Sequence, residues 1–157
     1  MNQKTDWIPK EIFKDCMYYM PICCVDILPF NPEKTKVLLG KRNNEPLKGE
    51  YFSTGGRLLK GEEFKDCAVR KAKEELGLEI SSELLLPGGT LNEIHKNSAF
   101  GDEIGYHAVV VYFGYLIQED TKIILEDQHS DFKWFEINDP TIHPFVKERI
   151  NNIIANK

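Results

Sequence analysis

The 157-residue sequence lacks the features that would assign it to several specialised classes of protein. Its four cysteines form no C-x-x-C pair and have no histidine at zinc-finger spacing nearby, so neither a structural zinc site nor a disulfide framework is expected. Buried thiols in a reducing compartment are the preferred interpretation. A positive charge excess is also missing, because the formal net charge is -5. This balance argues against a nucleic-acid partner, which needs a broad basic face.

Long apolar runs are absent as well. Residues 1–10 contain no apolar core of signal-peptide length, and no stretch approaches a membrane span, so we expect a cytoplasmic protein without a membrane partner. The chain also shows no internal repeat, low-complexity tract or linker. Its length and its 41% hydrophobic content are those of one globular unit, and residues 1–157 are therefore predicted to form a single domain.

The periodicity of the chain predicts strands first, with helices between and after them. Helices are expected at 10–17, 63–76 and 144–154, and strands at 18–28, 36–41, 51–52, 84–94, 107–117 and 132–135. This mixed order predicts the α+β class, with a layered sandwich of sheet and helices. In the central helix the apolar residues Phe64, Ala68, Ala72 and Leu76 recur at i+4, which places Arg70, Lys71 and Glu74 on a charged face away from the core.

Residues 56–78 are the most informative segment. They follow the pattern G-x5-E-x7-R-x3-E-E-x-G plus an apolar residue, whose chance occurrence in such a chain is on the order of one in a few hundred thousand. Carboxylates without cysteine or histidine suit Mg²⁺ or Mn²⁺ better than zinc. Two of the three carboxylates also have a simpler interpretation: Glu74 can pair with Arg70 one turn earlier, and Glu62 can serve the helix dipole.

The segment resembles the Nudix box of hydrolases that cleave nucleoside diphosphates linked to another group. The resemblance implies a Nudix-type α/β/α sandwich with a mixed sheet between helices. Where the box usually has Arg-Glu, this chain has Arg70-Lys71, so one metal-facing carboxylate is missing. The standard reaction uses several metal ions on three or four carboxylates. The chain is therefore either an inactive copy or an enzyme whose chemistry needs one metal ion.

The match extends to the GDP-mannose mannosyl hydrolases, Nudix relatives that cleave a carbon–oxygen bond and lack the same glutamate. It spans about residues 11–135 and includes residues 38–42, 55–57 and 126–134. By this resemblance His129 is the general base that activates water, and a histidine suits that role because its reference pKa is about 6.5. Arg42 and Arg57 would stabilise the departing diphosphate. Asp26 would lie near the sugar and base, or form a structural pair with one of these arginines.

The same resemblance implies the remaining site residues. The metal ion, Mg²⁺ or Mn²⁺, would be held by the Gly55 carbonyl, Glu75 and Gln128, with Glu74 and Glu62 as further candidates; the glycine pair could also be a plain turn. The residues assigned to substrate binding are Phe13, Lys41, Arg70, His95 and Tyr106. Among these, the Phe13 ring would stack on guanine or pack in a helix core, and His95 and Tyr106 would close over the sugar. The resemblance also implies a homodimer.

The leading hypothesis is a metal-dependent hydrolase of a nucleotide sugar, GDP-mannose or GDP-glucose in type. Water would attack the anomeric carbon with inversion and give a nucleoside diphosphate and a free hexose. One alternative is a conventional pyrophosphatase that gives a nucleoside monophosphate and a sugar 1-phosphate, which retention of Glu74 and Glu75 favours. The other is a catalytically silent nucleotide-binding module, supported by the missing glutamate.

Overall fold

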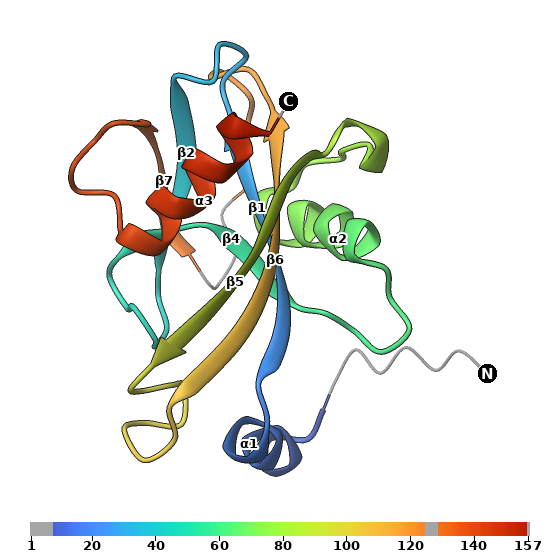
Figure 1. The fold of residues 1–157 in the computed structure, drawn as a ribbon, viewed down its shortest axis with the longest axis vertical. Helices are drawn as coiled ribbons and strands as arrows, with labels where there is room; N and C mark the ends of the chain where they lie inside the picture. Colours follow the sequence, from blue (N-terminus) through green and yellow to red (C-terminus); the bar gives the residue numbers. More distant parts are fainter. Residues whose placement is uncertain (1–7, 125–128, 157) are drawn as a thin grey trace.

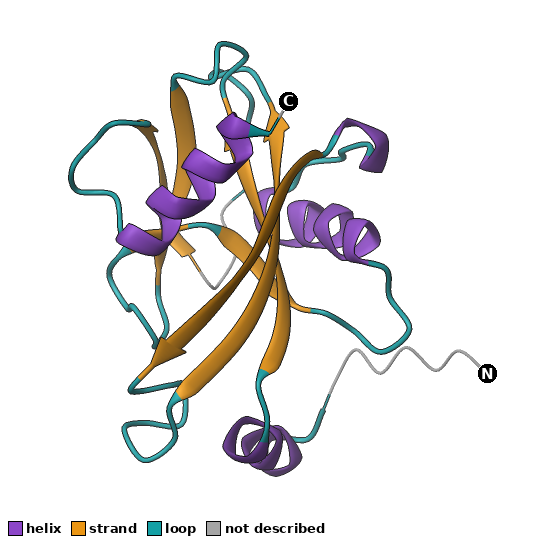
Figure 2. Ribbon diagram, viewed as in Figure 1, coloured by secondary structure: helices purple, strands orange, loops and turns teal. Residues whose placement is uncertain are grey.

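The computed structural model describes residues 8–124 and 129–156, which form one mixed sheet covered by helices (Figures 1 and 2). The helices are α1 (Lys10–Tyr19), α2 (Phe64–Leu76), α3 (Pro144–Ala155) and the short 3₁₀ helix η1 (Ser82–Leu84). The strands are β1 (Ile22–Phe30), β2 (Lys36–Arg42), β3 (Tyr51–Phe52), β4 (Thr54–Arg57), β5 (Leu86–His95), β6 (Tyr106–Leu116) and β7 (His129–Glu136).

Strand β1 is the centre of the sheet. It runs parallel to β6 along its whole length, from the pair Ile22–Ala108 to the pair Phe30–Leu116. The pairings of β1 with β2 and β4, of β2 with β3 and β7, and of β5 with β6 are antiparallel. The central strand order is β3-β2-β1-β6-β5, with β4 added to β1 and β7 added to β2.

Helices cover both faces of the sheet, so the predicted α+β sandwich is confirmed (Figure 1). Helix α2 packs its Cys67, Ala68 and Ala72 against one face, in a cluster with Val25 and Ile27 of β1. Helix α3 packs on the other face, in a second cluster whose buried members include Val146, Ile150 and Ile153 from the helix and Leu28, Phe30 and Tyr112 from the strands. Helix α1 closes a third cluster at one end of the sheet.

The predicted position of Lys71 on an exposed face of α2 is wrong. Lys71 is only 8% exposed and Glu75, one turn later, only 3%. Because residues four apart on a helix lie nearly one above the other, both side chains flank the stripe of small residues that faces the sheet. The helix ends where expected, since Gly77 adopts φ +67 and the amide of Leu78 bonds back to the Ala72 carbonyl.

Two predicted strands begin at clearly different residues in the structure. The apolar run predicted as a strand at 18–28 divides between α1, which continues to Tyr19, and β1, which begins after Pro21. β1 also continues through Pro29, which lies in register with Tyr115 of β6. Strand β7 begins at His129 rather than at residue 132. Its alternating polar residues face solvent, so the full strand could not be recognised from a run of apolar residues.

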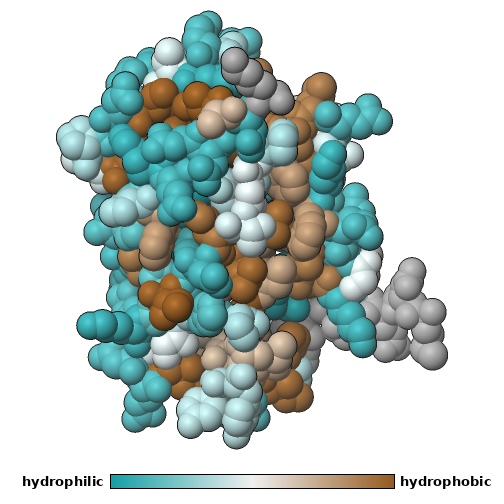
Figure 3. All heavy atoms as spheres, in the orientation of Figure 1, coloured by the Kyte–Doolittle hydropathy of each residue, from teal (hydrophilic) through white to brown (hydrophobic). Residues whose placement is uncertain are grey.

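The visible surface in Figure 3 mixes hydrophilic and hydrophobic side chains. All four cysteines are free thiols, and Cys24 and Cys67 are buried. Within residues 8–124 and 129–156, no helix is long and apolar enough to cross a membrane.

Candidate active site

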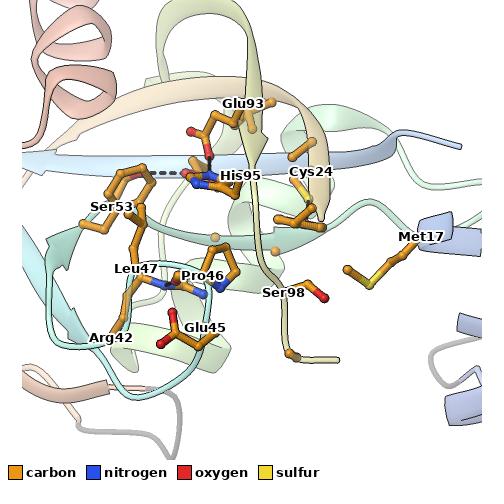
Figure 4. Close-up of a pocket in the computed structure, with 18 of the residues that line it drawn as sticks. Met17, Cys24, Arg42, Glu45, Pro46, Leu47, Ser53, Glu93, His95 and Ser98 are labelled. Carbon is orange, nitrogen blue, oxygen red and sulfur yellow. Dashed lines mark hydrogen bonds and ion pairs between the residues drawn. The ribbon is translucent and has the colours of Figure 1, made fainter. Parts of the chain in front are cut away.

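A cavity of about 200 Å³ is lined by residues of α1, β1, β4, β5, β6 and the loop after β2 (Figure 4). It brings together residues that are far apart in the sequence. Seven residues singled out from the sequence line it: Phe13, Asp26, Arg42, Gly55, His95, Tyr106 and His129. Of the others, Lys41, Arg57, Glu62, Arg70, Glu74 and Glu75 are not among its lining residues, and Gln128 lies outside the described residues.

His129 stands at the start of β7, on the wall of this cavity. Its strand position pairs it with Arg42 at the end of β2, which fixes the backbone that carries the imidazole. The ring is 5% exposed and lies 5.2 Å from the Phe132 ring. Although the strand was expected to begin only at residue 132, His129 belongs to the sheet, and its side chain is almost fully buried.

The His129 imidazole faces the carboxylate of Glu75 from α2. Nδ1 lies 3.3 Å from Glu75 Oε2, but neither atom has a hydrogen-bond partner among the described residues, and the same is true of His129 Nε2. Burial raises the pKa of Glu75, yet the contacts with His129 and Lys71 outweigh it and lower the pKa below its ordinary value. An ionised carboxylate and an imidazole with both nitrogens unoccupied therefore meet beside the cavity.

Lys71 neutralises the same carboxylate from the other side. Its ammonium lies 2.7 Å from Glu75 Oε1 and 3.1 Å from Glu74 Oε2. Burial alone would lower the pKa of Lys71, but the two carboxylates raise it, so the side chain is charged. Lys71 and Glu75, at i,i+4 on α2, thus form a buried ion pair.

Glu62 and Arg70 form a second ionic contact. Arg70 Nε lies 2.7 Å from Glu62 Oε1, its Nη1 lies 3.1 Å from Glu74 Oε2, and its Nη2 donates to the Arg57 carbonyl. Burial would raise the pKa of Glu62, but hydrogen bonds from Arg70 and the Leu59 amide lower it to about 2. Arg70 therefore links α2 to the segment that precedes it and so orients residues 56–78. It is not among the residues that line the cavity.

The three glutamates of the box, Glu62, Glu74 and Glu75, are called the carboxylate cluster below. Each of them contacts Arg70 or Lys71, and within residues 8–124 and 129–156 no group of three or more Asp, Glu, His or Cys side chains is placed to share a metal ion. The unpartnered Glu75 Oε2 is the kind of hard oxygen that Mg²⁺ prefers. Among the described carboxylates of the cluster, Glu75 is thus the one with an oxygen available to a divalent ion.

Asp26 does not pair with Arg42 or Arg57, as the sequence suggested it might, but with Arg149 of α3. Arg149 is fully buried, and its Nη2 lies 3.4 Å from Asp26 Oδ2 and in direct contact with Glu93 Oε1. Ser53 donates a further hydrogen bond to Asp26. Burial raises the pKa of Asp26, while Arg149 and Ser53 oppose that rise. The floor of the cavity is thus a buried ionic network of two carboxylates around one guanidinium.

The His95 imidazole continues this network toward the mouth of the cavity. Nε2 lies 3.3 Å from Glu93 Oε2, and the ring stacks on Tyr106 at a centroid distance of 6.4 Å (Figure 4 shows Glu93 and His95 together). Burial and the nearby Arg42 lower the pKa of His95. The Tyr106 hydroxyl lies 3.0 Å from the Cys24 thiol, whose pKa burial raises to about 12.

The aromatic and cationic residues divide into those at the cavity and those away from it. Phe13 lines the cavity and also packs 6.3 Å from Phe100, so both of its expected roles are compatible with its place. Arg42 lines the cavity, with its Nε bonded to the Pro46 carbonyl at 2.8 Å. Lys41, the next residue, pairs in register with Tyr51 and Asp131 instead.

Sequence reasoning missed Glu93 and Arg149, which complete the floor of the cavity. A signal for Arg149 was present, because it falls on the apolar stripe of α3 between Val146 and Ile150. A charged residue on such a stripe must be buried with a partner of opposite charge. Glu93 gave a weaker signal. At this point of the strand the charged residue is buried and its apolar neighbour Ile94 is 72% exposed, the reverse of the usual arrangement.

Comparison with known proteins places this geometry in a family. The family model for the NUDIX domain matches residues 20–155. The low-salt glycan biosynthesis protein Agl8 of Haloferax volcanii is 30% identical over 150 residues, which cover 96% of this chain and 93% of that protein.

Solved structures share the fold at lower identity. A MutT NUDIX hydrolase from Burkholderia pseudomallei superposes with a TM-score of 0.68 at 18% identity, over 85% of this chain and 98% of that one. The NUDIX domain of Shewanella oneidensis NrtR, solved with ADP ribose, superposes with a TM-score of 0.63 at 21% identity, over 96% and 91% of the two chains.

Proposed function

Because the chain belongs to the NUDIX domain family, we propose that it is a hydrolase of nucleotide sugars that releases a nucleoside diphosphate and a free hexose. The sugar would be attacked by water at its anomeric carbon, with inversion, as in the GDP-mannose mannosyl hydrolases that residues 11–135 resemble. The proposal treats residues 1–157 as one catalytic domain. GDP-mannose and GDP-glucose are the substrates to test first.

The observation that carries the proposal is the position of His129. A general base must have a nitrogen free to accept a proton and must stand where water can reach the substrate. His129 lines the cavity, and its two ring nitrogens are buried but lack a hydrogen-bond partner among the described residues, so the proposal needs a water bound inside the cavity beside one of them. The Glu75 carboxylate at 3.3 Å would stabilise the imidazolium that forms when His129 takes the proton.

The leaving diphosphate needs compensation of its charge, and Arg42 at the cavity supplies one guanidinium for that purpose. Nudix hydrolases generally use divalent metal ions such as Mg²⁺ or Mn²⁺. Glu75 is the described residue that would hold such an ion, with Gly55 and Gln128 as the further ligands that the resemblance implies. When bound, the ion would neutralise charge on the diphosphate, so that no side chain need protonate the leaving group.

Two relatives support a nucleotide sugar as the substrate class. The curated relative of 30% identity is named for glycan biosynthesis, a process built on activated sugars. ADP ribose, the ligand of the NrtR domain, is itself a nucleoside diphosphate joined to a sugar. The acidic floor of the cavity, with Asp26 and Glu93, is suited to accept hydrogen bonds from sugar hydroxyls.

Product analysis in oxygen-18 water tests the proposal. The protein is incubated with GDP-mannose and Mg²⁺, and the products are analysed by mass spectrometry. Label on the hexose is the expected result. Label on a phosphate would instead support a pyrophosphatase that gives GMP and mannose 1-phosphate. Absence of turnover with both GDP-mannose and GDP-glucose would support a nucleotide-binding module without catalysis.

We also propose that the protein is a cytoplasmic homodimer. Helix α1 leaves Ile12, Tyr18, Tyr19 and Met20 more than half exposed, and Tyr19 is 80% exposed. Large apolar side chains gathered on one helix are typical of a surface that a partner covers. Light scattering coupled to size-exclusion chromatography checks the mass: replacement of Tyr18 and Tyr19 by serine should yield monomers, and a monomeric wild type would contradict the proposal.

A further inference from the structure

The position of Lys71 in the carboxylate cluster is fixed by the packing around its side chain. Its side chain crosses the backbone of Gly56, where an added Cβ would lie 2.7 Å from Lys71 Cε and 3.0 Å from Nζ. The glycine therefore leaves the space that the lysine fills. The Lys71 side chain is 10% exposed, and its ammonium is held between Glu74 and Glu75 at 3.1 and 2.7 Å.

The charges around Lys71 limit what else the cluster can bind. Among the described residues the cluster contributes three carboxylates, and they contact two fixed cations, Arg70 and Lys71. These three carboxylates and two cations leave one net negative charge. A second or third divalent ion would add positive charge beside these two cations, and no group of three or more acidic, His or Cys side chains among residues 8–124 and 129–156 is placed to balance it.

We propose that the Lys71 ammonium is a permanent cation of this site, which occupies the role of a divalent ion and restricts the cluster to a single metal ion. Because the ammonium is covalently attached to the chain, it cannot leave the site or be removed by a chelator. The site therefore keeps one positive charge, half that of a divalent ion, at all metal concentrations. The ammonium also holds Glu75 Oε1 and leaves Oε2 directed toward His129. The inference rests on the proposed function only for the catalytic purpose of the single metal ion, since the number of bound ions can be measured without substrate.

Manganese binding tests this role directly. Mn²⁺ is titrated into the whole protein and its free fraction is followed by electron paramagnetic resonance, for wild type, Lys71→Glu and Lys73→Glu. Lys73 lies on the same helix but is 70% exposed and pairs only with Glu79 at 3.5 Å, so its variant matches the change of charge without touching the cluster. The expected stoichiometry is one Mn²⁺ per chain for wild type and Lys73→Glu, and at least two for Lys71→Glu.

A second variant covers the case in which Lys71→Glu does not fold. Lys71→Gln removes the competing ammonium without a new carboxylate, and it should bind its single Mn²⁺ about tenfold or more tightly than wild type. Two or more ions on the wild type, or equal binding by the Lys71 and Lys73 variants, would overturn the role of Lys71. Failure of the proposed function appears separately, as an absence of GDP-mannose turnover while the Mn²⁺ counts still follow residue 71.

Discussion

Gly40 of β2 lies directly against the imidazole of His129, since an added Cβ at Gly40 would come within 2.6 Å of His129 Cδ2. The two residues belong to neighbouring antiparallel strands, so the missing side chain of one makes the position of the other possible. The same added atom would lie 2.7 Å from the Phe132 ring, which packs on the imidazole. The candidate base is thus positioned by a strand pair and not by its own hydrogen bonds.

Replacement of Gly40 by alanine should therefore displace His129. We expect Gly40→Ala to lower kcat by at least tenfold, because a displacement of the base by about 1 Å is costly in catalysis. Denaturation should show a loss of roughly 1 to 3 kcal/mol from overpacking, with a cooperative transition retained. Gly40→Ala combined with Phe132→Ala, which frees one of the two clashes, should recover part of the rate; an unchanged kcat in Gly40→Ala would contradict this account.

Removal of the base itself should be more severe. His129→Gln keeps the size and polarity of the side chain but cannot accept a proton at neutral pH, so kcat for nucleotide-sugar hydrolysis should fall by about 10² to 10⁴. His107→Gln is the control, since His107 lies on β6 with its Nε2 bonded to Asn92, outside the cavity lining. Equal rates for both variants would remove His129 from the base role.

Arg42 and Lys41 are adjacent cations that the structure separates. Arg42 lines the cavity and Lys41 does not. Arg42→Gln should lower kcat/KM by about 10- to 100-fold, the loss expected for one hydrogen bond to a charged ligand. Lys41→Gln should stay within roughly twofold of wild type. If initial rates show Lys41→Gln as the more damaged variant, the binding surface lies on the other side of β2.

Glu62 should make stability depend on acidity. Its pKa is about 2 in the folded protein against an ordinary value of 4.5, so its stabilising contribution is present above pH 4.5 and is lost as the pH falls toward 2. We expect Glu62→Gln to reduce the free energy of unfolding by roughly 1 to 3 kcal/mol at pH 7. Urea titrations at pH 7 and pH 3 should show that the gap from wild type narrows in acid; a constant gap would contradict the ion pair with Arg70.

Arg149 should be important for stability as well as for the cavity. Arg149→Met leaves Asp26 and Glu93 buried without their cation, and breaking a buried pair in this way costs roughly 3 to 5 kcal/mol. Adding Glu93→Gln to that variant removes one of the stranded charges and should restore part of the loss. Urea unfolding measures both effects, with the exposed Glu148→Met as the matched control on α3; additive losses in the double variant would argue against the network.

The sequence predicted the three α-helices and most strands of the sheet because these depend on local signals. It missed β4, whose glycine pair had been expected at a turn rather than in a strand. The apolar period of residues 144–154 predicted α3 almost to its last residue, and the predicted helix stop at Gly77 is confirmed. The prediction for β7 was too short because the polar residues of this strand alternate with buried ones. A search for apolar residues detects only the central part of such a strand.

The site was predicted only where a motif or a family resemblance reached it. His129, Arg42 and Asp26 were assigned in this way, and the structure brings all three to one cavity. Glu93 and Arg149 lie on strands and helices outside the box, and only the packing of α3 on β5 reveals that they meet. Lys71 was expected on a free face, because helical spacing identifies the neighbours along a helix but not the backbone that passes beneath it.

The ionic floor of the cavity joins an early strand, a middle strand and the last helix through a single guanidinium. Until that helix docks, two acids that will be buried remain without a counterion and repel each other. Formation of the binding pocket therefore depends on completion of the tertiary structure. A partly folded chain, in which the last helix has not yet packed, would have neither a rigid pocket nor activity.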